Sequence, residues 1–501
     1  MQKAYDHIVV GSGITGLSMA VMLGKAGRKV LLLEKAPRLG GSLCRFRRKS
    51  IPFDVGFHFT GGFHDSGVMN GMSKVLGIYD KLDLVFMTRE ADNRLIFEAE
   101  QEEFRLPPGL AELVSSLQSS FPNERAAIQT YFDTISKVVE NTVLTDLRNL
   151  STGMDYTDED FISLKDYLDK LTDNALLKAI LSGYSMCYGV RPSEISFSAH
   201  ARVCYSLFES VARVKDGGDA IVRAFEDRLA ALDIEAEKKC HIVACEDVKN
   251  KRVGRFVLSS GDEVTCDSCI FTIHPLEILK TLPREHLRKA FIDRVEDFEP
   301  SCGFFSVYGV VDGPVPANEF DLTVVALFPF ADVEAMYDVD REKDTFLGIS
   351  RCTETVKGVD HHVVNAFQPS FYEHVSRWSD STVGKRPAEY YEYKQKNLDG
   401  IVGKIRKLFP QYADRFRALD AASMLTYRDY LNNPFGASYG IKQKINQFNL
   451  LGKLPLHNIH AAGQSAVLPG LAGAMTSAFL VGRSILGEQH YNRMIEEALG
   501  Q

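Results

Sequence analysis

The fold is decided by the stretch Val9-Val10-Gly11-Ser12-Gly13-Ile14-Thr15-Gly16, near the start of the chain. It predicts the end of a strand, a glycine turn and the start of a helix. Gly11 permits the tight turn, Gly13 lets a pyrophosphate approach the backbone, and Gly16 lets the helix pack closely on the strand. The first turn of that helix offers free N–H groups and the positive end of its dipole to phosphates.

The residues that follow supply the context that this motif requires. Residues 17–26 predict the helix, and residues 29–34 predict a second strand that ends at Glu34. A carboxylate at the end of that strand can accept hydrogen bonds from the hydroxyl groups of an adenosine ribose. We therefore predict a βαβ unit that binds a dinucleotide.

Length and charge narrow the class of protein. The chain has 501 residues, which predicts two or more domains. A net charge of −8 argues against a nucleic-acid partner, because such partners favour a basic surface. The basic run at residues 45–49 is short and predicts a solvated loop, with contact to an anionic membrane surface as the alternative.

The cysteines predict neither a disulfide framework nor a metal site. Nine cysteines are scattered along the chain, and the CxxC at Cys266 and Cys269 has no second pair at zinc-ligand spacing. No apolar run is long enough to predict a transmembrane helix, and the first strand begins too close to Met1 for a signal peptide. These features predict a cytoplasmic protein, with peripheral membrane contact left open.

Three further blocks combine glycine with apolar or aromatic residues. They are Gly40-Gly41-Ser42, Phe53-Asp54-Val55-Gly56-Phe57-His58, and residues 463–475. Glycine at such positions lets the backbone come close to a flat ligand. The last block predicts a strand, a turn and a helix N-terminus, which can stabilise negative charge on a bound ring. Ordinary turns and a buried apolar helix are the alternative interpretation.

Together these blocks resemble the FAD-dependent amine-oxidase-like superfamily of flavoproteins, with its GR2-type fold. Within it the chain is most similar to the phytoene desaturase, carotenoid isomerase and retinol saturase group. Residues 427–440 are also similar to the segment that precedes the final flavin motif in that group. The resemblance covers both ends of the chain, is thin in the middle, and implies FAD as the cofactor.

The resemblance also implies the architecture. It is an α/β fold with a Rossmann-like FAD-binding domain of GR2 type that is discontinuous in sequence, a mixed α+β substrate domain and a helical lobe. We expect the FAD-binding domain to comprise residues 1–106, 214–275 and 455–501. Residues 107–213, with their helical periodicity, would form the helical substrate lobe, and residues 276–454 a substrate domain with a mixed sheet.

Carried over by position, the resemblance implies a role for each block. The first glycine turn would hold the pyrophosphate, Glu34 the adenosine ribose, and the backbone near Cys245 the adenine. Gly56 and His58 would lie near the isoalloxazine, and residues 473–475 would place amides toward its pyrimidine edge. The expected cofactor-binding residues are Gly11, Ser12, Gly13, Ile14, Thr15, Gly16, Glu34, Lys35, Gly40, Gly41, Ser42, Gly56, His58, Cys245, Gly463, Gln464, Gly473, Ala474 and Met475.

One position departs from the pattern of the group. Many of its members carry aspartate after the glycine that aligns with Gly463, whereas this chain has Gln464. A neutral amide can still hydrogen-bond a hydroxyl group, so FAD binding remains expected. The Gly-Gln form is similar to bacterial members of the retinol saturase type.

The resemblance implies an FAD-dependent oxidoreductase that desaturates or saturates carbon–carbon bonds of a hydrophobic polyene or isoprenoid substrate, by hydride transfer at flavin N5. Such a substrate requires an apolar tunnel between the lobes. A saturation also needs a proton donor near the reacting carbon. Each candidate for this chemistry also has a structural role as its alternative. The candidates are His58, Tyr184, His200, Arg202, Tyr427 and Tyr439.

Three alternative functions are weighed beside this one. A flavin-dependent amine oxidase commonly flanks the flavin with aromatic residues, but the single tryptophan, Trp378, lies outside every flavin motif. A non-redox isomerase of double bonds that uses reduced FAD stays open. A non-catalytic prenyl-lipid-binding protein lacks a functional flavin site, whereas this chain retains Glu34 and the C-terminal motif. The oligomeric state and the electron donor or acceptor are not predicted.

Overall fold

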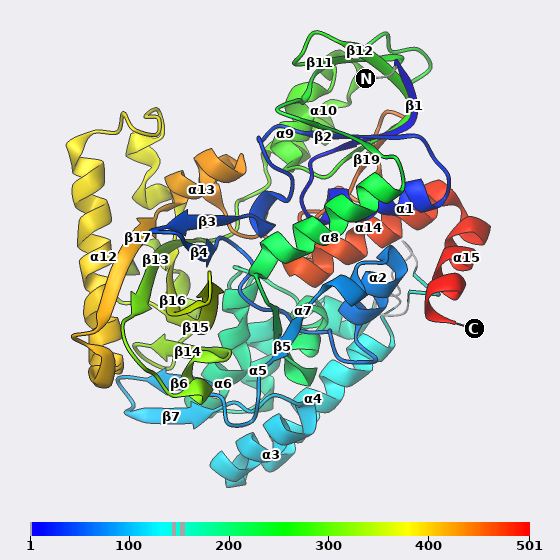
Figure 1. The fold of residues 1–501 in the computed structure, drawn as a ribbon. Coiled ribbons are helices and arrows are strands. Elements are labelled where there is room, and N and C mark those ends of the chain that lie inside the picture. The colour runs from blue at the N-terminus through cyan, green and yellow to red at the C-terminus, as the bar shows by residue number, and fades with distance from the viewer. Residues whose placement is uncertain (1–2, 143–146, 151–155, 501) are drawn as a thin grey trace.

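The computed structural model describes residues 3–142, 147–150 and 156–500, which form two large sheets and a helical lobe (Figure 1). Residues 1, 2 and 501 of the predicted FAD-binding domain lie outside the described residues, as do residues 143–146 and 151–155 of the predicted helical lobe. The α/β fold class is confirmed.

The first sheet contains the predicted βαβ unit. Its order is β10-β11-β12-β1-β2-β9, and β19 pairs with β12 and β18. The strands come from three separated stretches of chain, so this domain is discontinuous in sequence. Their bounds are β1 Ala4–Val10, β2 Val30–Glu34, β9 Glu235–Lys238, β10 Ile242–Glu246, β11 Arg255–Leu258, β12 Glu263–Phe271, β18 Gly452–Lys453 and β19 Ile459–Ala461.

Helices cover the face of this sheet on which the first turn lies. They are α1 Ile14–Lys25, α2 Val68–Leu76, α8 Gly217–Ala231, α14 Gly470–Leu486 and α15 Glu488–Leu499. Helix α1 packs against both α8 and α14. Its residues from Ile14 to Leu23 are all buried, because neighbours on several sides leave no solvated face. The N-terminal and C-terminal segments therefore share one core.

The second sheet has the order β17-β13-β16-β15-β14-β6-β7 and is antiparallel except for the β6–β14 pair. Helix α12, Ala388–Leu408, packs against it, and α13, Met424–Leu431, follows its last strand. The strands are β6 Arg94–Phe97, β7 Glu102–Arg105, β13 Gly303–Val311, β14 Thr323–Phe328, β15 Leu347–Val356, β16 Val359–Ser370 and β17 Phe416–Ala422.

The helical lobe shares one apolar core with β6, β7 and β14 of the second sheet. It contains α3 Leu110–Ser120, α4 Arg125–Glu140, α5 Leu164–Leu171, α6 Ala175–Ser182, the 3₁₀ helix η5 Gly183–Cys187 and α7 Phe197–Glu209. The remaining elements are a short hairpin of β3 Arg45–Arg48 and β4 Ile51–Asp54, and a two-stranded antiparallel sheet of β5 Leu84–Phe86 and β8 Ala212–Val214. Two helices, α9 Pro275–Thr281 and α10 Lys289–Glu296, follow β12.

One expected domain boundary has to move. Residues 1–106 were assigned to the FAD-binding domain, but β6 and β7 belong to the second sheet, where Arg94 pairs with Val325 of β14. This pairing joins residues more than 200 positions apart, so no local pattern indicates it. The remaining domain bounds stay predictions.

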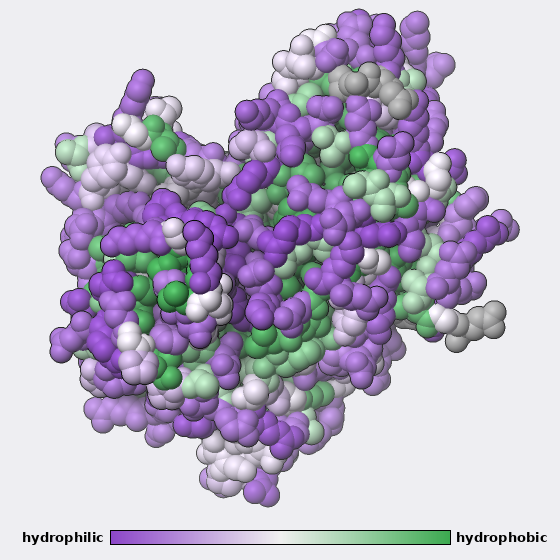
Figure 2. Space-filling view, viewed as in Figure 1, coloured by the Kyte–Doolittle hydropathy of each residue, from purple (hydrophilic) through white to green (hydrophobic). Residues whose placement is uncertain are grey.

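Polar residues dominate the surface in Figure 2, and apolar residues show between them in patches. The same view is hollowed between the part that carries α13 and the part that carries α9 and α10. Among the described residues, no helix combines the length and apolar character needed to cross a bilayer.

Candidate functional site

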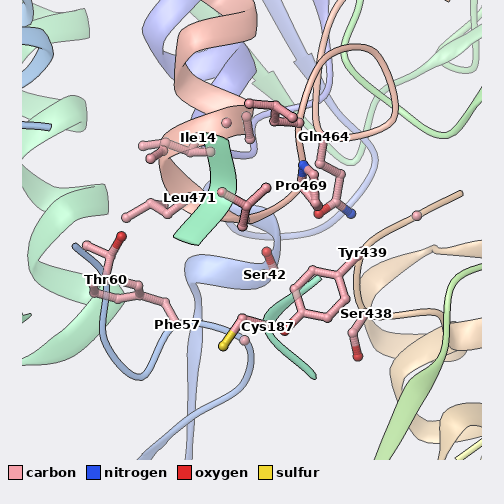
Figure 3. Close-up of a pocket in the computed structure, with 18 of the residues that line it drawn as sticks. Ile14, Ser42, Phe57, Thr60, Cys187, Ser438, Tyr439, Gln464, Pro469 and Leu471 are labelled. Carbon is pink, nitrogen blue, oxygen red and sulfur yellow. The ribbon is translucent and has the colours of Figure 1, made fainter. Parts of the chain in front are cut away.

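A cavity of about 840 Å³ extends from the first glycine turn to the space between the helical lobe and the second sheet. This volume is within the range of about 300 to 1,000 Å³ that is typical of ligand sites. In Figure 3, Ile14, Leu471 and Gln464 lie along one side of the pocket. Cys187, Tyr439 and Ser438 lie along the other side, with Ser42 between the two groups (Figure 3).

The first glycine turn forms one end of this cavity. Gly11 has a φ of +96°, and a methyl group there would lie 2.8 Å from Thr272 Oγ1. A methyl group on Gly16 would lie 1.8 Å from the carbonyl oxygen of Gly11, so Gly16 permits the close packing of α1 on β1. A methyl group on Gly13 would have no protein atom within 4 Å. The space over Gly13 therefore belongs to the cavity.

Glu34 closes β2 beside this turn and is only 8% exposed. Its Oε2 accepts hydrogen bonds from the backbone N–H of Ser12 at 2.9 Å and from the Ser12 hydroxyl at 2.5 Å. Its Oε1 accepts one from the N–H of Ala36 at 2.7 Å. Because each carboxylate oxygen has more than one acceptor site, Glu34 retains capacity for ligand hydroxyls.

The C-terminal block reaches the same cavity through the N-terminus of α14. Thr15 Oγ1 donates a hydrogen bond to the carbonyl oxygen of Ala474 at 2.8 Å and so joins α1 to α14. The N–H of Gly463 donates to Ser477 Oγ at 2.7 Å, which fixes the turn that precedes the helix. No side chain caps the start of α14, so the N–H groups of its first turn are available to a ligand.

These features fit FAD. Neither α1 nor α14 has a side chain that caps its N-terminus, and both N-termini face the cavity. Uncapped N–H groups and helix dipoles favour negative charge, as a pyrophosphate carries or a reduced ring develops. The open space over Gly13 and the buried Glu34 match the needs of a pyrophosphate and a ribose.

Most of the expected cofactor-binding residues line the cavity. Gln464 lines it with its side chain in Figure 3, while its backbone oxygen accepts a hydrogen bond from Gln443 Nε2 at 3.1 Å. The full set is Gly11, Ser12, Gly13, Ile14, Thr15, Glu34, Lys35, Gly41, Ser42, Gly56, His58, Gly463, Gln464, Gly473 and Ala474.

Four expected residues do not line the cavity. Gly16 instead packs against Gly11, and Gly40 hydrogen-bonds through its backbone to Ser12. Met475 is fully buried in the core that α14 shares with α1.

Cys245 is the fourth of these residues, and the expectation that it lies at the adenine end of the cavity has to be corrected. It lies in the apolar core on the other face of the first sheet, and Cys240, His241 and Ile242 line the cavity in its place. The N–H of Cys240 bonds to the carbonyl oxygen of Glu34 at 2.9 Å. This bond places the residues just before β10, rather than Cys245 within it, beside the end of β2.

A buried charge cluster supports the turn that carries His58. Arg45 Nε lies 2.8 Å from Asp54 Oδ1, and Arg45 Nη2 lies 2.8 Å from Glu354 Oε1, which also pairs with Arg213. Burial raises the pKa of the Asp54 carboxyl to about 6, although Arg45 favours its charged form. The cluster links β4 to β15 of the second sheet and so holds the two domains together at the cavity.

His58 is neutral at physiological pH. Burial, with smaller contributions from Arg213 and Arg45, lowers the pKa of His58 to about 4. Its ring stacks on Phe367 at 5.5 Å, and its buried Nδ1 has no hydrogen-bond partner among the described residues. It is therefore a neutral polar group at the wall of the cavity.

Three of the other candidates for the chemistry line the cavity but are already engaged. Tyr427 donates a hydrogen bond to Ser306 Oγ at 2.6 Å, and Tyr439 donates one to the carbonyl oxygen of Met186 at 3.2 Å. Arg202 forms an ion pair with Asp160, 2.6 Å from Nη1 to Oδ1.

Tyr184 differs, because its hydroxyl group makes no hydrogen bond to any residue that the structure describes.

The structure does not bring His200 to the cavity. His200 is fully buried in the helical lobe, where Tyr131 OH lies 2.7 Å from Nε2 and Tyr188 OH lies 2.8 Å from Nδ1. Burial lowers the pKa of His200 to about 3, so the ring is neutral. A neutral imidazole has one donor and one acceptor nitrogen, and the two tyrosines satisfy both. Its role is structural.

The apolar wall of the cavity is the part that sequence analysis missed. It is built mainly by the second sheet and by α6, η5 and α7. On β13, Phe304 and Ser306 line the cavity while Phe305 and Val307 enter the core on the other face. This alternation is the signal that could have identified the wall. The lining includes Leu95, Ile180, Met186, Cys187, Val203, Leu207, Phe304, Val324, Ala326, Phe328, Phe346 and Phe367.

Two helix N-termini from opposite ends of the chain face one cavity, and this arrangement is typical of a protein that binds a dinucleotide. Comparisons with known proteins agree with this class. The model of the family described as flavin containing amine oxidoreductase matches residues 14–308, more than half of the chain. The chain belongs to this family, and it is an FAD-dependent oxidoreductase.

Individual relatives confirm the resemblance to the retinol saturase and carotenoid isomerase group. All-trans-retinol 13,14-reductase of Danio rerio is 26% identical over 534 residues, which cover 96% of this chain and 86% of that protein. The chloroplastic prolycopene isomerase of Daucus carota is 23% identical over 478 residues, which cover 90% and 74%. The crystal structure of an oxidoreductase from Methanosarcina mazei has a TM-score of 0.65 at 14% identity, over 94% of this chain and 98% of that one, and shares the fold.

Proposed function

We propose that the protein catalyses a redox reaction at carbon–carbon bonds, saturation or desaturation, of a hydrophobic polyene or isoprenoid substrate. The observation that carries the proposal is the apolar chamber that continues from the dinucleotide end of the cavity. Relatives that are named for retinol reduction and for prolycopene isomerisation support the same class of substrate. An elongated apolar molecule gains free energy from burial in such a chamber, at about 25 cal/mol per Å².

The residues that would hold the cofactor follow from the lining of the cavity. The first turn of α1, from Gly13 to Thr15, would bind the pyrophosphate, and Glu34 the adenosine ribose. Residues 471–474, in the first turn of α14, would bind the pyrimidine edge of the ring. Bound FAD would supply hydride transfer at N5.

The apolar wall excludes water from this part of the cavity, and the two domains fix the substrate between them. Phe304 and Phe367, which meet edge to face at 5.5 Å, would pack against the polyene chain. His58 remains uncharged there, so the substrate meets no free charge at that position.

The test is product analysis with the purified flavoprotein. We expect reconstituted protein to show flavin absorbance and to convert an isoprenoid polyene, all-trans-retinol or a carotene, with a mass change of two hydrogen atoms per turnover. The flavin is first reduced with dithionite to test saturation, or left oxidised to test desaturation. A product of unchanged mass would indicate isomerisation, and protein that binds no flavin would contradict the proposal.

The same assay separates the amine oxidase alternative, since turnover of simple amines with release of peroxide would favour it. The relatives named above do not favour it, and they do not favour a non-catalytic lipid-binding role.

We also propose peripheral contact with a membrane, in a cytoplasmic location. Tyr430 is 66% exposed and adjoins Leu431, which lines the cavity at the end of α13, and Phe448 is 69% exposed. Exposed aromatic rings favour the interface of a bilayer. A membrane would also be a source of a lipid substrate. We expect the protein to sediment with anionic liposomes and Tyr430→Ser to weaken sedimentation. Failure of the unaltered protein to sediment would contradict this part of the proposal.

A further inference from the structure

Tyr184 is the feature of the cavity that the proposed function leaves unexplained. It lies in η5, lines the cavity, and packs edge to face against Phe208 with ring centroids 4.9 Å apart. The residue is only partly exposed, and protein surrounds it. Its accessible surface therefore faces the cavity. Burial raises the pKa of Tyr184 well above its ordinary value, so the hydroxyl stays protonated and is a donor.

Tyr184 packs against the apolar core of the helical lobe. Ile180, Val203 and Phe328 line the same chamber, from α6, α7 and β14. Tyr184 makes no hydrogen bond to any described residue. A ligand that supplies an acceptor in this chamber therefore gains a hydrogen bond from a donor that the protein leaves unused.

The other two tyrosines singled out from the sequence are already hydrogen-bonded to the protein. The hydroxyl of Tyr427 is held by Ser306, and that of Tyr439 by the carbonyl oxygen of Met186. Among the tyrosines singled out from the sequence, Tyr184 is thus the one whose donor is free for a ligand within the described structure.

The charges restrict what that ligand can carry. Arg202 is paired with Asp160, and Arg94 pairs with both Asp92 and Glu103. A carboxylate in the apolar chamber would find both of these guanidinium groups neutralised, and burial of an unpaired charge is costly. A neutral oxygen function avoids this cost.

We propose that Tyr184 determines specificity by donating a hydrogen bond to a neutral oxygen function of the substrate, a hydroxyl or a carbonyl group. The substrate class is then an oxygenated isoprenoid rather than a hydrocarbon polyene or an isoprenoid acid. This inference rests on the proposed function and narrows it. A site built around a substrate hydroxyl discriminates strongly against the analogue that lacks it, because the buried protein group is then left unpaired.

The test compares three ligands on the flavin-loaded protein. They are all-trans-retinol, the hydrocarbon in which hydrogen replaces its hydroxyl group, and retinoic acid. Dissociation constants are measured from quenching of protein or flavin fluorescence. We expect the alcohol to bind about tenfold more tightly than the hydrocarbon, which equals about 1.4 kcal/mol, and more tightly than the acid.

Two variants complete the design. Tyr184→Phe should bind the alcohol and the hydrocarbon within about twofold of each other, with unchanged flavin content and no loss of melting temperature. Tyr167→Phe is the matched control, because its hydroxyl bonds to Thr134 in the same lobe and the residue does not line the cavity. It should preserve the tenfold preference.

Several results would overturn the inference. Equal binding of the alcohol and the hydrocarbon to the unaltered protein would overturn this inference and leave the proposed function standing. A preference for the alcohol that survives in Tyr184→Phe would do the same. Tightest binding of the acid would contradict the inference that the substrate carries a neutral oxygen function. Loss of flavin in Tyr184→Phe assigns the hydroxyl to the cofactor instead. Binding of neither polyene, with no product in the assay above, overturns the proposed function and this inference with it.

Discussion

Gly13 and Gly16, the second and third glycines of the first motif, have different structural roles. Gly16 is surrounded by protein, with the carbonyl oxygen of Gly11 in the way of any side chain. Gly13 faces open space and has a φ of −64°, which any residue can adopt. Gly16 therefore serves the fold, and Gly13 serves the ligand.

This difference predicts opposite behaviour of two alanine variants. Gly13→Ala should leave the melting temperature of the flavin-free protein nearly unchanged and weaken FAD binding at least tenfold, because its methyl group occupies the ligand space. Gly16→Ala should destabilise the flavin-free protein by about 3 kcal/mol or more, as overpacking against backbone does. Calorimetry of the flavin-free proteins and titration with FAD measure both quantities. Tight FAD binding by Gly13→Ala would contradict the assignment.

Among the secondary-structure elements, the first strand, helix and strand of the chain were predicted correctly from local sequence patterns. The strand expected before Gly11, the helix after it and the strand ending at Glu34 correspond to β1, α1 and β2. β1 and β2 pair directly with each other and α1 connects them, so this unit closes within a short stretch of chain.

Elements fixed by distant partners could not be predicted in this way. The strand β6 joins the second sheet through β14, so the expected domain boundary at residue 106 fell in the wrong place. The position of Cys245 depended on the hydrogen bond that joins Cys240, which precedes β10, to Glu34 at the end of β2, and a single sequence does not show this contact. His200 was a reasonable candidate by residue type, yet Tyr131 and Tyr188 bury it.

The two ends of the candidate site differ in how far the sequence predicts them. The dinucleotide end is built from local sequence motifs, and most of the residues expected there line the cavity. Its apolar end is a surface assembled from the helical lobe and the second sheet. The free hydroxyl of Tyr184 has meaning only when all its neighbours are known, since the sequence cannot show which polar groups are left without partners.

On the scale of the whole molecule, buried histidines make stability depend on pH. Burial lowers the pKa of His200 to about 3 and those of His58, His274 and His460 to about 4. The unfolded chain binds protons at these groups near pH 6.5, whereas the folded protein does not. Stability that is present above pH 6.5 is therefore lost as the pH falls. For His200 alone the loss is about 2 kcal/mol at pH 5, at 1.36 kcal/mol per pH unit.

Asp54 acts in the opposite direction. Its pKa is raised from 3.8 to about 6, so the folded protein binds more protons than the unfolded chain between those values and gains stability as the pH falls. Because four histidines oppose this one carboxyl, we expect the melting temperature of the holoprotein to fall between pH 7 and pH 5, at constant ionic strength. Between pH 7 and pH 8 these five groups titrate little in either state, so the melting temperature should change much less there than between pH 7 and pH 5. A melting temperature that is equal or higher at pH 5 would contradict the prediction that burial of these histidines governs the pH dependence.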